Sequence, residues 1–267
     1  YKGKNGAWVR LYDANDPIHD PQYTLDVLEW TRLASIAIHK LGLLVIPNYS
    51  KMTLDSNTLA VANYTDGFLA EGGFTSWNPK PNTSSFNIPP PFTNPTKFKQ
   101  QVQFVRHLQN AGKGFFAINE WGEGPDYHLN PSCQPHNITR QVRQFVAAAF
   151  MMTNGESSGI FLTCTQCYGG DCGGVGNFSI WTPEFNAKVG VPMEEPTMNE
   201  TNGVWSRLYS TGLTFVNPDN MNHYTVSLPK LSGSIWQDVY GNEITGSVIN
   251  LEPATGMILV HEDIIHK

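Results

Sequence analysis

Residues 94–118, NPTKFKQQVQFVRHLQNAGKGFFAI, decide the fold that the sequence predicts. Asn94 and Pro95 form a helix N-cap followed by a proline in the first turn, and Gly112 stands where a helix ends in a left-handed residue. Apolar side chains at helical spacing mark one face of this helix, namely Phe98, Val102, Val105 and Leu108. The uninterrupted apolar run at 115–118 then predicts a strand buried on both faces, as in a parallel sheet.

Three further segments repeat this helix-then-strand pattern. Their helices and strands are expected at residues 20–42 and 43–46, at 54–62 and 66–71, and at 137–155 and 159–162. Alternating helices and strands predict a parallel sheet, and four strands at these intervals favour half of a (β/α)8-type barrel. We therefore expect an α/β fold in which the N-terminal strands of the barrel are missing from this chain. A doubly wound sheet is the alternative, although no glycine-rich phosphate loop follows any strand.

The pattern changes near Trp205. Short, turn-bounded segments rich in β-forming residues follow at 213–218, 224–229, 235–238 and 257–260. They predict a small antiparallel β-sandwich or meander. We therefore expect two domains, a partial (β/α) barrel over residues 1–200 and an all-β domain over residues 201–267.

Composition and charge exclude several partners. The net charge is −6 and no run of Lys or Arg occurs, so the surface that nucleic acid or anionic lipid requires is not expected. No apolar stretch reaches the eighteen or so residues that would span a bilayer. We expect a soluble protein without a membrane span, which begins after any targeting segment.

Asparagines and cysteines indicate the compartment. N-x-[ST] sequons occur at Asn48, Asn63, Asn82, Asn137, Asn177 and Asn199, roughly twice the number expected by chance. The cysteines are Cys133, Cys164, Cys167 and Cys172. In an oxidising compartment they predict two disulfides with three possible connectivities, and the alternative is a zinc site made by all four thiolates. Together these features favour a secreted or extracellular N-glycosylated protein.

Polar residues gather where the predicted strands end, which is where barrel enzymes place their chemistry. Glu71, Glu120 and Asp66 are the candidate catalytic carboxylates. Such carboxylates suit glycoside hydrolysis, in which one acid protonates the glycosidic oxygen and a second carboxylate attacks the anomeric carbon or activates water. Asp66 has a structural alternative, as a residue at the start of a strand that bonds to backbone amides.

Amides and tryptophans complete the candidate site. We expect Asn48 and Asn119 to orient sugar hydroxyls, and Trp121 and Trp77 to stack on sugar rings. The histidines form no H-E-x-x-H or H-x-H pattern and no G-x-S-x-G elbow occurs, so neither metal hydrolysis nor serine-esterase chemistry is expected. No metal ion or cofactor is expected.

Several short motifs resemble those of glycosidase-like TIM-barrel families, which are similar in layout to clan-D-type and α-galactosaminidase-type barrels. They are Asp26-Val-Leu-Glu-Trp30, His39-Lys-Leu-Gly-Leu-Leu-Val-Ile-Pro-Asn48, Asp66-Gly-Phe-Leu-Ala-Glu71-Gly-Gly-Phe74 and Gly212-Leu-Thr-Phe-Val-Asn217-Pro218, with a Leu-Pro, an Asp-Val-Tyr-Gly and a terminal Gly-Met-Ile-Leu. The resemblance implies a nucleophilic Asp after the fourth strand and the acid/base after the sixth. Glu71 takes the acid/base position if the strand ending at Asn48 is the fifth, and the nucleophile would then precede Tyr1.

Two functions follow as expectations. The first is a secreted glycoside hydrolase-like protein that acts on or binds carbohydrate, with Glu71 as acid/base. The second is a non-catalytic extracellular glycoprotein with a structural, assembly or carbohydrate-binding role. The expected partners are a glycan or polysaccharide, and an N-terminal fragment of the same protein or an extracellular assembly.

Overall fold

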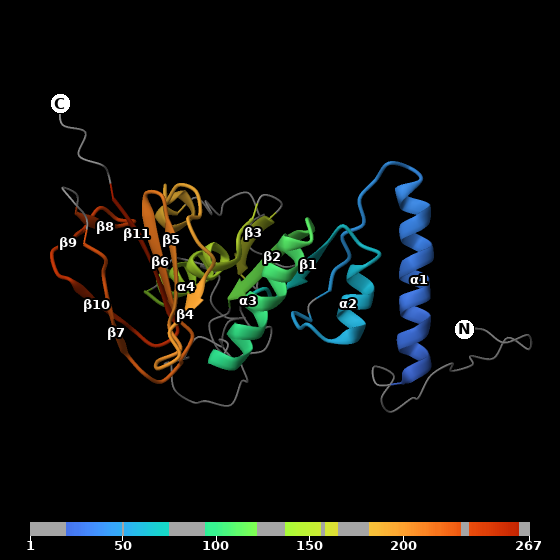
Figure 1. Cartoon of the computed structure of the whole chain (residues 1–267), viewed down its shortest axis with the longest axis horizontal. Helices are drawn as coiled ribbons and strands as arrows, with labels where there is room; N and C mark the ends of the chain where they lie inside the picture. Colours follow the sequence, from blue (N-terminus) through green and yellow to red (C-terminus); the bar gives the residue numbers. More distant parts are fainter. Residues whose placement is uncertain are drawn as a thin grey trace, which may run out of the picture.

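The computed structural model describes residues 20–49, 51–74, 94–121, 137–155, 158–164, 182–230 and 235–261. Figure 1 shows two helices at one end, a parallel sheet with its helices in the middle, and antiparallel sheets at the other end. The helices are α1 (Pro21–His39), α2 (Ser56–Ala62), α3 (Pro95–Asn110) and α4 (Asn137–Thr153). The polypeptide therefore passes from α/β to all-β structure along its length.

The parallel sheet consists of β1 (Gly67–Glu71), β2 (Gly114–Trp121) and β3 (Ser158–Cys164), in the order β1-β2-β3. Glu71 of β1 pairs with Ile118 of β2. A short extended segment adds to the free edge of β1, where Asn48 forms a parallel bridge with Leu69. The backbone N–H of Tyr49 donates to the carbonyl of Leu69 at 2.7 Å.

Local sequence explains where the helices begin. Asp20 caps α1 by accepting from the backbone N–H groups of Gln22 and Tyr23, and Pro21 occupies its first turn. Asn94 caps α3 in the same way, accepting from the N–H of Lys97 at 2.8 Å. A polar cap followed by proline therefore marks a helix start at both sites, as the sequence predicted.

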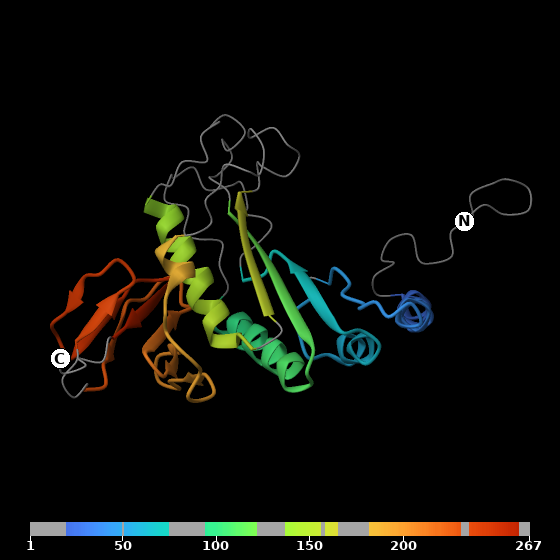
Figure 2. The same cartoon turned by 90° about the horizontal axis from the view of Figure 1, so that it is seen from above.

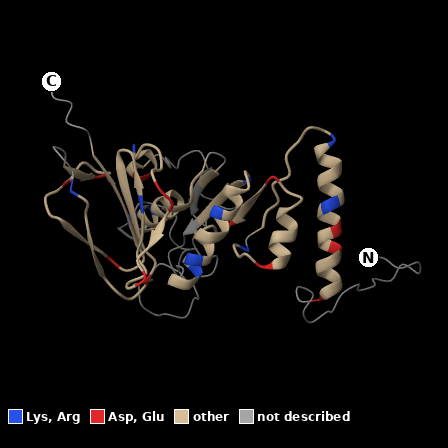
Figure 3. Ribbon diagram, in the orientation of Figure 1, with Lys and Arg blue, Asp and Glu red and all other residues tan. Residues whose placement is uncertain are grey.

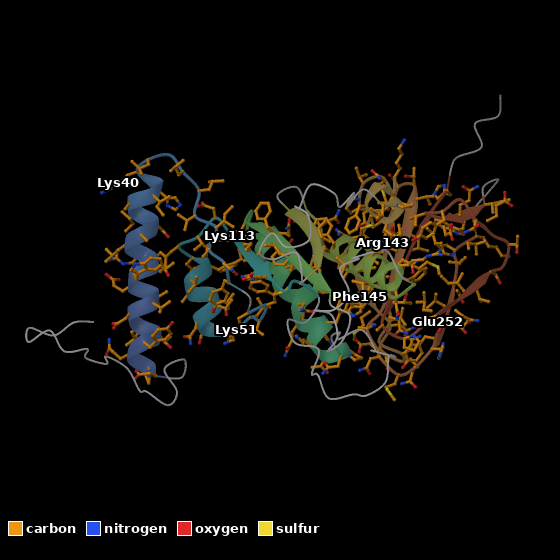
Figure 4. The ribbon with its side chains drawn as sticks, turned by 180° about the vertical axis from the view of Figure 1, so that it is seen from behind. Lys40, Lys51, Lys113, Arg143, Phe145 and Glu252 are labelled. Atoms are coloured by element: carbon orange, nitrogen blue, oxygen red, sulfur yellow. The ribbon has the colours of Figure 1, made fainter. Side chains whose placement is uncertain are left out.

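Alternation along the strands divides the parallel sheet into two faces. Phe68 and Phe115 are fully buried, whereas Phe116, next in sequence to Phe115, is only half-buried. The buried face meets α3 through Phe68 and Phe104, whose ring centroids are 5.8 Å apart, and α3 meets α4 through Phe98 and Phe145, whose centroids are also 5.8 Å apart. Figure 2 shows both helices beside the sheet, and Figure 4 labels Phe145 on α4. The main core therefore lies between the parallel sheet and these two helices.

The C-terminal part forms antiparallel sheets behind α4. Its elements are η5 (Pro183–Asn186), β4 (Thr197–Met198), β5 (Trp205–Tyr209), β6 (Gly212–Asn217), β7 (Tyr224–Ser227), β8 (Trp236–Asp238), β9 (Glu243–Ile244), β10 (Val248–Leu251) and β11 (Thr255–Val260). Six strands form one sheet in the order β4-β5-β6-β11-β8-β9, and β10 pairs with β7 in a second. A Cβ at Gly256 of β11 would lie 2.4 Å from Cβ of Ala148, so this glycine lets the sheet approach α4 closely.

The expectation of half a (β/α)8-type barrel is wrong. In the described part of the chain, the parallel sheet has three strands and four helices occur, and the chain continues into antiparallel sheets. The prediction of a buried strand at residues 43–46 is also wrong, because Leu43 and Leu44 are 57% and 71% exposed. An apolar run without alternation is typical of a central parallel strand, but here the run leads into the edge of the sheet.

Helix α1 contributes little to the core. It contacts α2 through a narrow face that includes the buried Thr31 and Ser35, while Trp30 remains 70% exposed and Leu33 is exposed as well. Figure 1 shows α1 at the end of the molecule beyond α2. None of the described helices is both long enough and apolar enough to cross a membrane.

Candidate functional site

The structure brings Asn48 and Glu71 together. Nδ2 of Asn48 donates a hydrogen bond to Oε2 of Glu71 at 2.7 Å, although the two residues are 23 positions apart in the sequence. Glu71 is the last residue of β1, and Asn48 lies on the segment that pairs with β1 in parallel. Asn48 is exposed and Glu71 is half-buried. The carboxyl ends of two neighbouring parallel segments therefore present an amide and a carboxylate at the molecular surface.

The backbone of Glu120 lies near this pair. Ile118 stands opposite Glu71, and Glu120 follows two residues later on β2, opposite Thr163 of β3. Strand spacing and rise place the Cα atoms of Glu71 and Glu120 about 8 Å apart, at register positions on the same face. The side chains of Glu120 and Trp121, and all of Trp77, lie outside the described residues.

Asn119 is directed to the other face of the sheet. Its side chain is fully buried, and its Oδ1 accepts from the backbone N–H of Phe74 at 2.7 Å. Because neighbouring residues on a strand face opposite sides, Asn119 and Glu120 belong to different faces of β2. Asn119 therefore supports the turn that follows β1, and it lies away from the exposed rim where it was predicted to meet a sugar.

Asp66 lies at the opposite end of β1 from Glu71. Its Oδ2 accepts from the backbone N–H of Val45 at 2.7 Å and contacts Nε2 of His39 at 2.8 Å. Partial burial by itself raises the pKa of Asp66, but the hydrogen bonds from Val45 and His39, with the charges of His39 and Lys113, hold it below its ordinary value. Glu71 is five positions after Asp66 along extended backbone, a distance of about 16 Å, so the two carboxylates do not share a rim.

Lys113 strengthens this Asp66 end of the sheet. Its Nζ donates to the backbone carbonyl of Thr65 at 2.6 Å, just before β1 begins. Figure 4 labels Lys113 near the sheet, and Figure 3 shows that basic and acidic residues are interspersed along the described ribbon. The contacts at this end hold the start of β1 against its neighbouring segments.

The described sequons are all at exposed asparagines. Asn63 is the C-cap of α2, Asn199 lies in the turn before β5, and Asn48 is in the rim already described. The side chain of Asn137 and all of Asn82 and Asn177 lie outside the described residues.

The expected cysteine pairing also lies outside them. Only the backbone of Cys164, at the end of β3, is described, and Cys133, Cys167 and Cys172 are not. Among the described residues, no three His, Cys, Asp or Glu side chains converge as metal ligands.

Gln101 also supports the turn that follows β1, a role that was not predicted from the sequence. It lies on α3, is buried, and donates from Nε2 to the carbonyl of Gly73 at 3.1 Å. The feature of the sequence that indicates it is a polar residue between Phe98 and Val102, on the side of the helix that faces the core.

Neither a protein-family model nor a curated protein sequence matches this chain.

Proposed function

We propose that this chain is a secreted, glycoside hydrolase-like protein that binds carbohydrate at the rim containing Asn48 and Glu71. The hydrogen bond between Asn48 Nδ2 and Glu71 Oε2 carries the proposal, because it sets a carboxylate at the carboxyl end of a parallel strand. Ligands of open α/β sheets bind outside these strand ends. The motif resemblance to glycosidase-like families supports carbohydrate as the substrate class.

Glu71 is the acid/base in this proposal. As an acid it gives a proton to the glycosidic oxygen. In a retaining reaction Glu120 attacks the anomeric carbon, and Glu71 then removes a proton from the water that displaces it; in an inverting reaction Glu120 removes the proton from the attacking water. Asn48 acts by holding one carboxylate oxygen through its amide N–H, which limits the rotation of the Glu71 side chain. Glu120 is the second carboxylate. The Cα atoms of Glu71 and Glu120 lie about 8 Å apart. A measured carboxyl separation of about 5–5.5 Å would indicate retention, and one of about 6.5–9.5 Å would indicate inversion.

A non-catalytic extracellular glycoprotein is the second candidate. It is supported by Asn63 and Asn199, the exposed asparagines of two sequons. In that case the same rim binds a glycan without cleaving it, and Glu71 serves as a hydrogen-bond acceptor for sugar hydroxyls. The two candidates share the ligand class and differ in whether a glycosidic bond breaks.

The test compares the wild-type chain with Glu71→Gln on a panel of α- and β-linked gluco-, galacto-, xylo- and N-acetylglucosamine oligosaccharides. Calorimetry measures binding and release of reducing ends measures hydrolysis. Loss of a general acid/base lowers hydrolysis by about 100- to 10,000-fold, while sugar affinity changes little because the glutamine keeps its shape.

Glu243→Gln is the matched control, since Glu243 is an exposed glutamate on β9 of the distant sheet. It should retain both sugar binding and hydrolysis. Binding without hydrolysis by the wild-type chain would favour the second candidate. Absence of both binding and hydrolysis across the panel would overturn the carbohydrate proposal.

A further inference from the structure

We propose that Asn119 and Gln101 are positioning residues for Glu71, acting through the turn that follows β1. This inference rests on the proposed function for the role of Glu71, although its structural part can be measured without any sugar. Neither side chain is placed against the Asn48–Glu71 rim. Both hold the backbone of the glycine turn directly after the carboxylate.

The turn itself has little intrinsic rigidity. Gly72 and Gly73 follow Glu71, with φ of 87° and 43°, and the N–H of Gly73 donates to the carbonyl of Ala70 at 3.2 Å. Glycine adopts such left-handed conformations at low cost, but it adopts many others as readily. An unsupported Gly-Gly turn would therefore let the end of β1 vary in direction.

One peptide group of the turn is held at both of its polar atoms. The carbonyl of Gly73 accepts from Gln101 Nε2 at 3.1 Å, and the N–H of the next residue, Phe74, donates to Asn119 Oδ1 at 2.7 Å. The two side chains come from different elements, α3 and β2. Hydrogen bonds to both polar atoms of a planar peptide restrain its orientation, and therefore the rotation about the backbone bonds on either side of it.

Close packing around Gly73 and Phe74 also restrains this turn. A Cβ at Gly73 would lie 2.5 Å from Asn119 Oδ1, so the amide lies directly against the glycine. The Phe74 ring is fully buried, with its centroid 6.4 Å from that of Phe98 and 6.2 Å from that of Phe115. The residues after Glu71 are therefore anchored in the core, while Glu71 itself faces the rim.

Loss of this support should lower the rate of hydrolysis more than it weakens the binding of sugar. A carboxylate displaced by about 1 Å can lose about a hundredfold in rate, while remote sugar contacts persist. We expect Asn119→Ala and Gln101→Met to lower kcat for oligosaccharide hydrolysis by about ten- to a hundredfold, with KM nearly unchanged. A merely structural effect would lower thermal stability without this split.

Gln141→Met is the matched control. Gln141 also donates its Nε2 to backbone carbonyls, those of Pro253 at 2.9 Å and Ala254 at 3.3 Å, but it does so on α4 away from the turn. Gln101→Met and Gln141→Met should show a similar fall in melting temperature. Only Gln101→Met should lower kcat. If Asn119→Ala does not fold, Gln101→Met carries the comparison, because methionine keeps the length of the side chain.

NMR makes the structural part independent of activity. The amide exchange of Phe74 should accelerate at least about tenfold in Asn119→Ala, and the side-chain Nδ2 signal of Asn48 should shift in Asn119→Ala and in Gln101→Met but not in Gln141→Met. An unshifted Asn48 signal with unchanged kcat would overturn the positioning role and leave the proposed function intact. If the wild-type chain binds sugar without cleaving it, the second candidate is favoured, and if it neither binds nor cleaves sugar, the proposed function fails. In both cases the Asn48 signal alone still decides whether the turn positions the rim.

Discussion

Arg207→Met removes the buried cation that joins α4 to the C-terminal sheet. Arg207 of β5 is 3% exposed, and its guanidinium donates to the carbonyls of Met151 at 3.0 Å and Asn154 at 3.2 Å, at the end of α4. It also donates to the carbonyl of Glu194 at 3.1 Å and to the side chain of Asn154 at 2.9 Å. The last carbonyls of a helix have no partner within the helix, so this side chain supplies them from another element.

The expected loss of stability follows from these contacts. A hydrogen bond that involves a charged group contributes about 1.5–3 kcal/mol net, and after the substitution the Met151 carbonyl keeps one donor, the Tyr209 hydroxyl. The four bonds belong to one side chain and do not add independently. We therefore expect Arg207→Met to lower the free energy of unfolding by about 3–5 kcal/mol. At roughly 2–4 °C per kcal/mol for a chain of this size, the melting temperature falls by on the order of 10 °C.

The assay is thermal and urea unfolding followed by circular dichroism, with Arg106→Met as the control. Arg106 of α3 pairs with Glu195, whose side chain is 66% exposed, so its loss should cost less than about 1 kcal/mol. Equal losses in the two variants would refute the reasoning. Equal losses would mean that burial and bonding to the helix-end carbonyls do not make the Arg207 contacts more stabilising than the exposed pair of Arg106 and Glu195.

Three further outcomes are expected. The folded-state pKa of Asp66 lies below its ordinary value, so the ionised carboxylate stabilises the fold above roughly pH 4, and this stabilisation is lost as pH falls through the folded-state pKa. The free energy of unfolding should therefore fall more steeply with decreasing pH for wild type than for Asp66→Asn. Secretion from a eukaryotic host followed by glycopeptide mass spectrometry should find glycan on the exposed Asn63 and Asn199, and unmodified peptides at both positions would contradict secretory processing. Gly256→Ala should cost about 1–3 kcal/mol by forcing β11 away from Ala148, and an unchanged urea midpoint would show that the sheet and α4 can separate freely.

Local signals in the sequence located the elements but not their assembly. The cap at Asn94 and the left-handed Gly112, with φ of 69°, mark the bounds of α3, and the apolar run after it is β2. The prediction of a barrel was wrong because barrel closure depends on how many strands pair, and no local sequence pattern contains that number. Residues 43–46 show this limit, since their apolar character predicted burial that Leu43 and Leu44 do not have.

The site was partly predictable for the same reason. Parallel strands end at one edge, and that rule was enough to predict that Asn48 and Glu71 would be neighbours. The side-chain period of two also separates Asn119 from Glu120, but choosing which of them faces the core required the position of α3. The hydrogen bond from Gln101 to the Gly73 carbonyl could not be predicted from the sequence, because it depends on the three-dimensional packing of a helix against a turn.

Chemical-shift mapping of the 15N-labelled chain with a bound oligosaccharide from the panel tests the carbohydrate site most directly. We predict the largest shifts at the backbone of Glu71 and Gly72 and at the Asn48 side chain, with none of comparable size at Tyr224 on β7. Shifts that gather around β7 and β10 and leave the Asn48–Glu71 pair unchanged would contradict the proposed site.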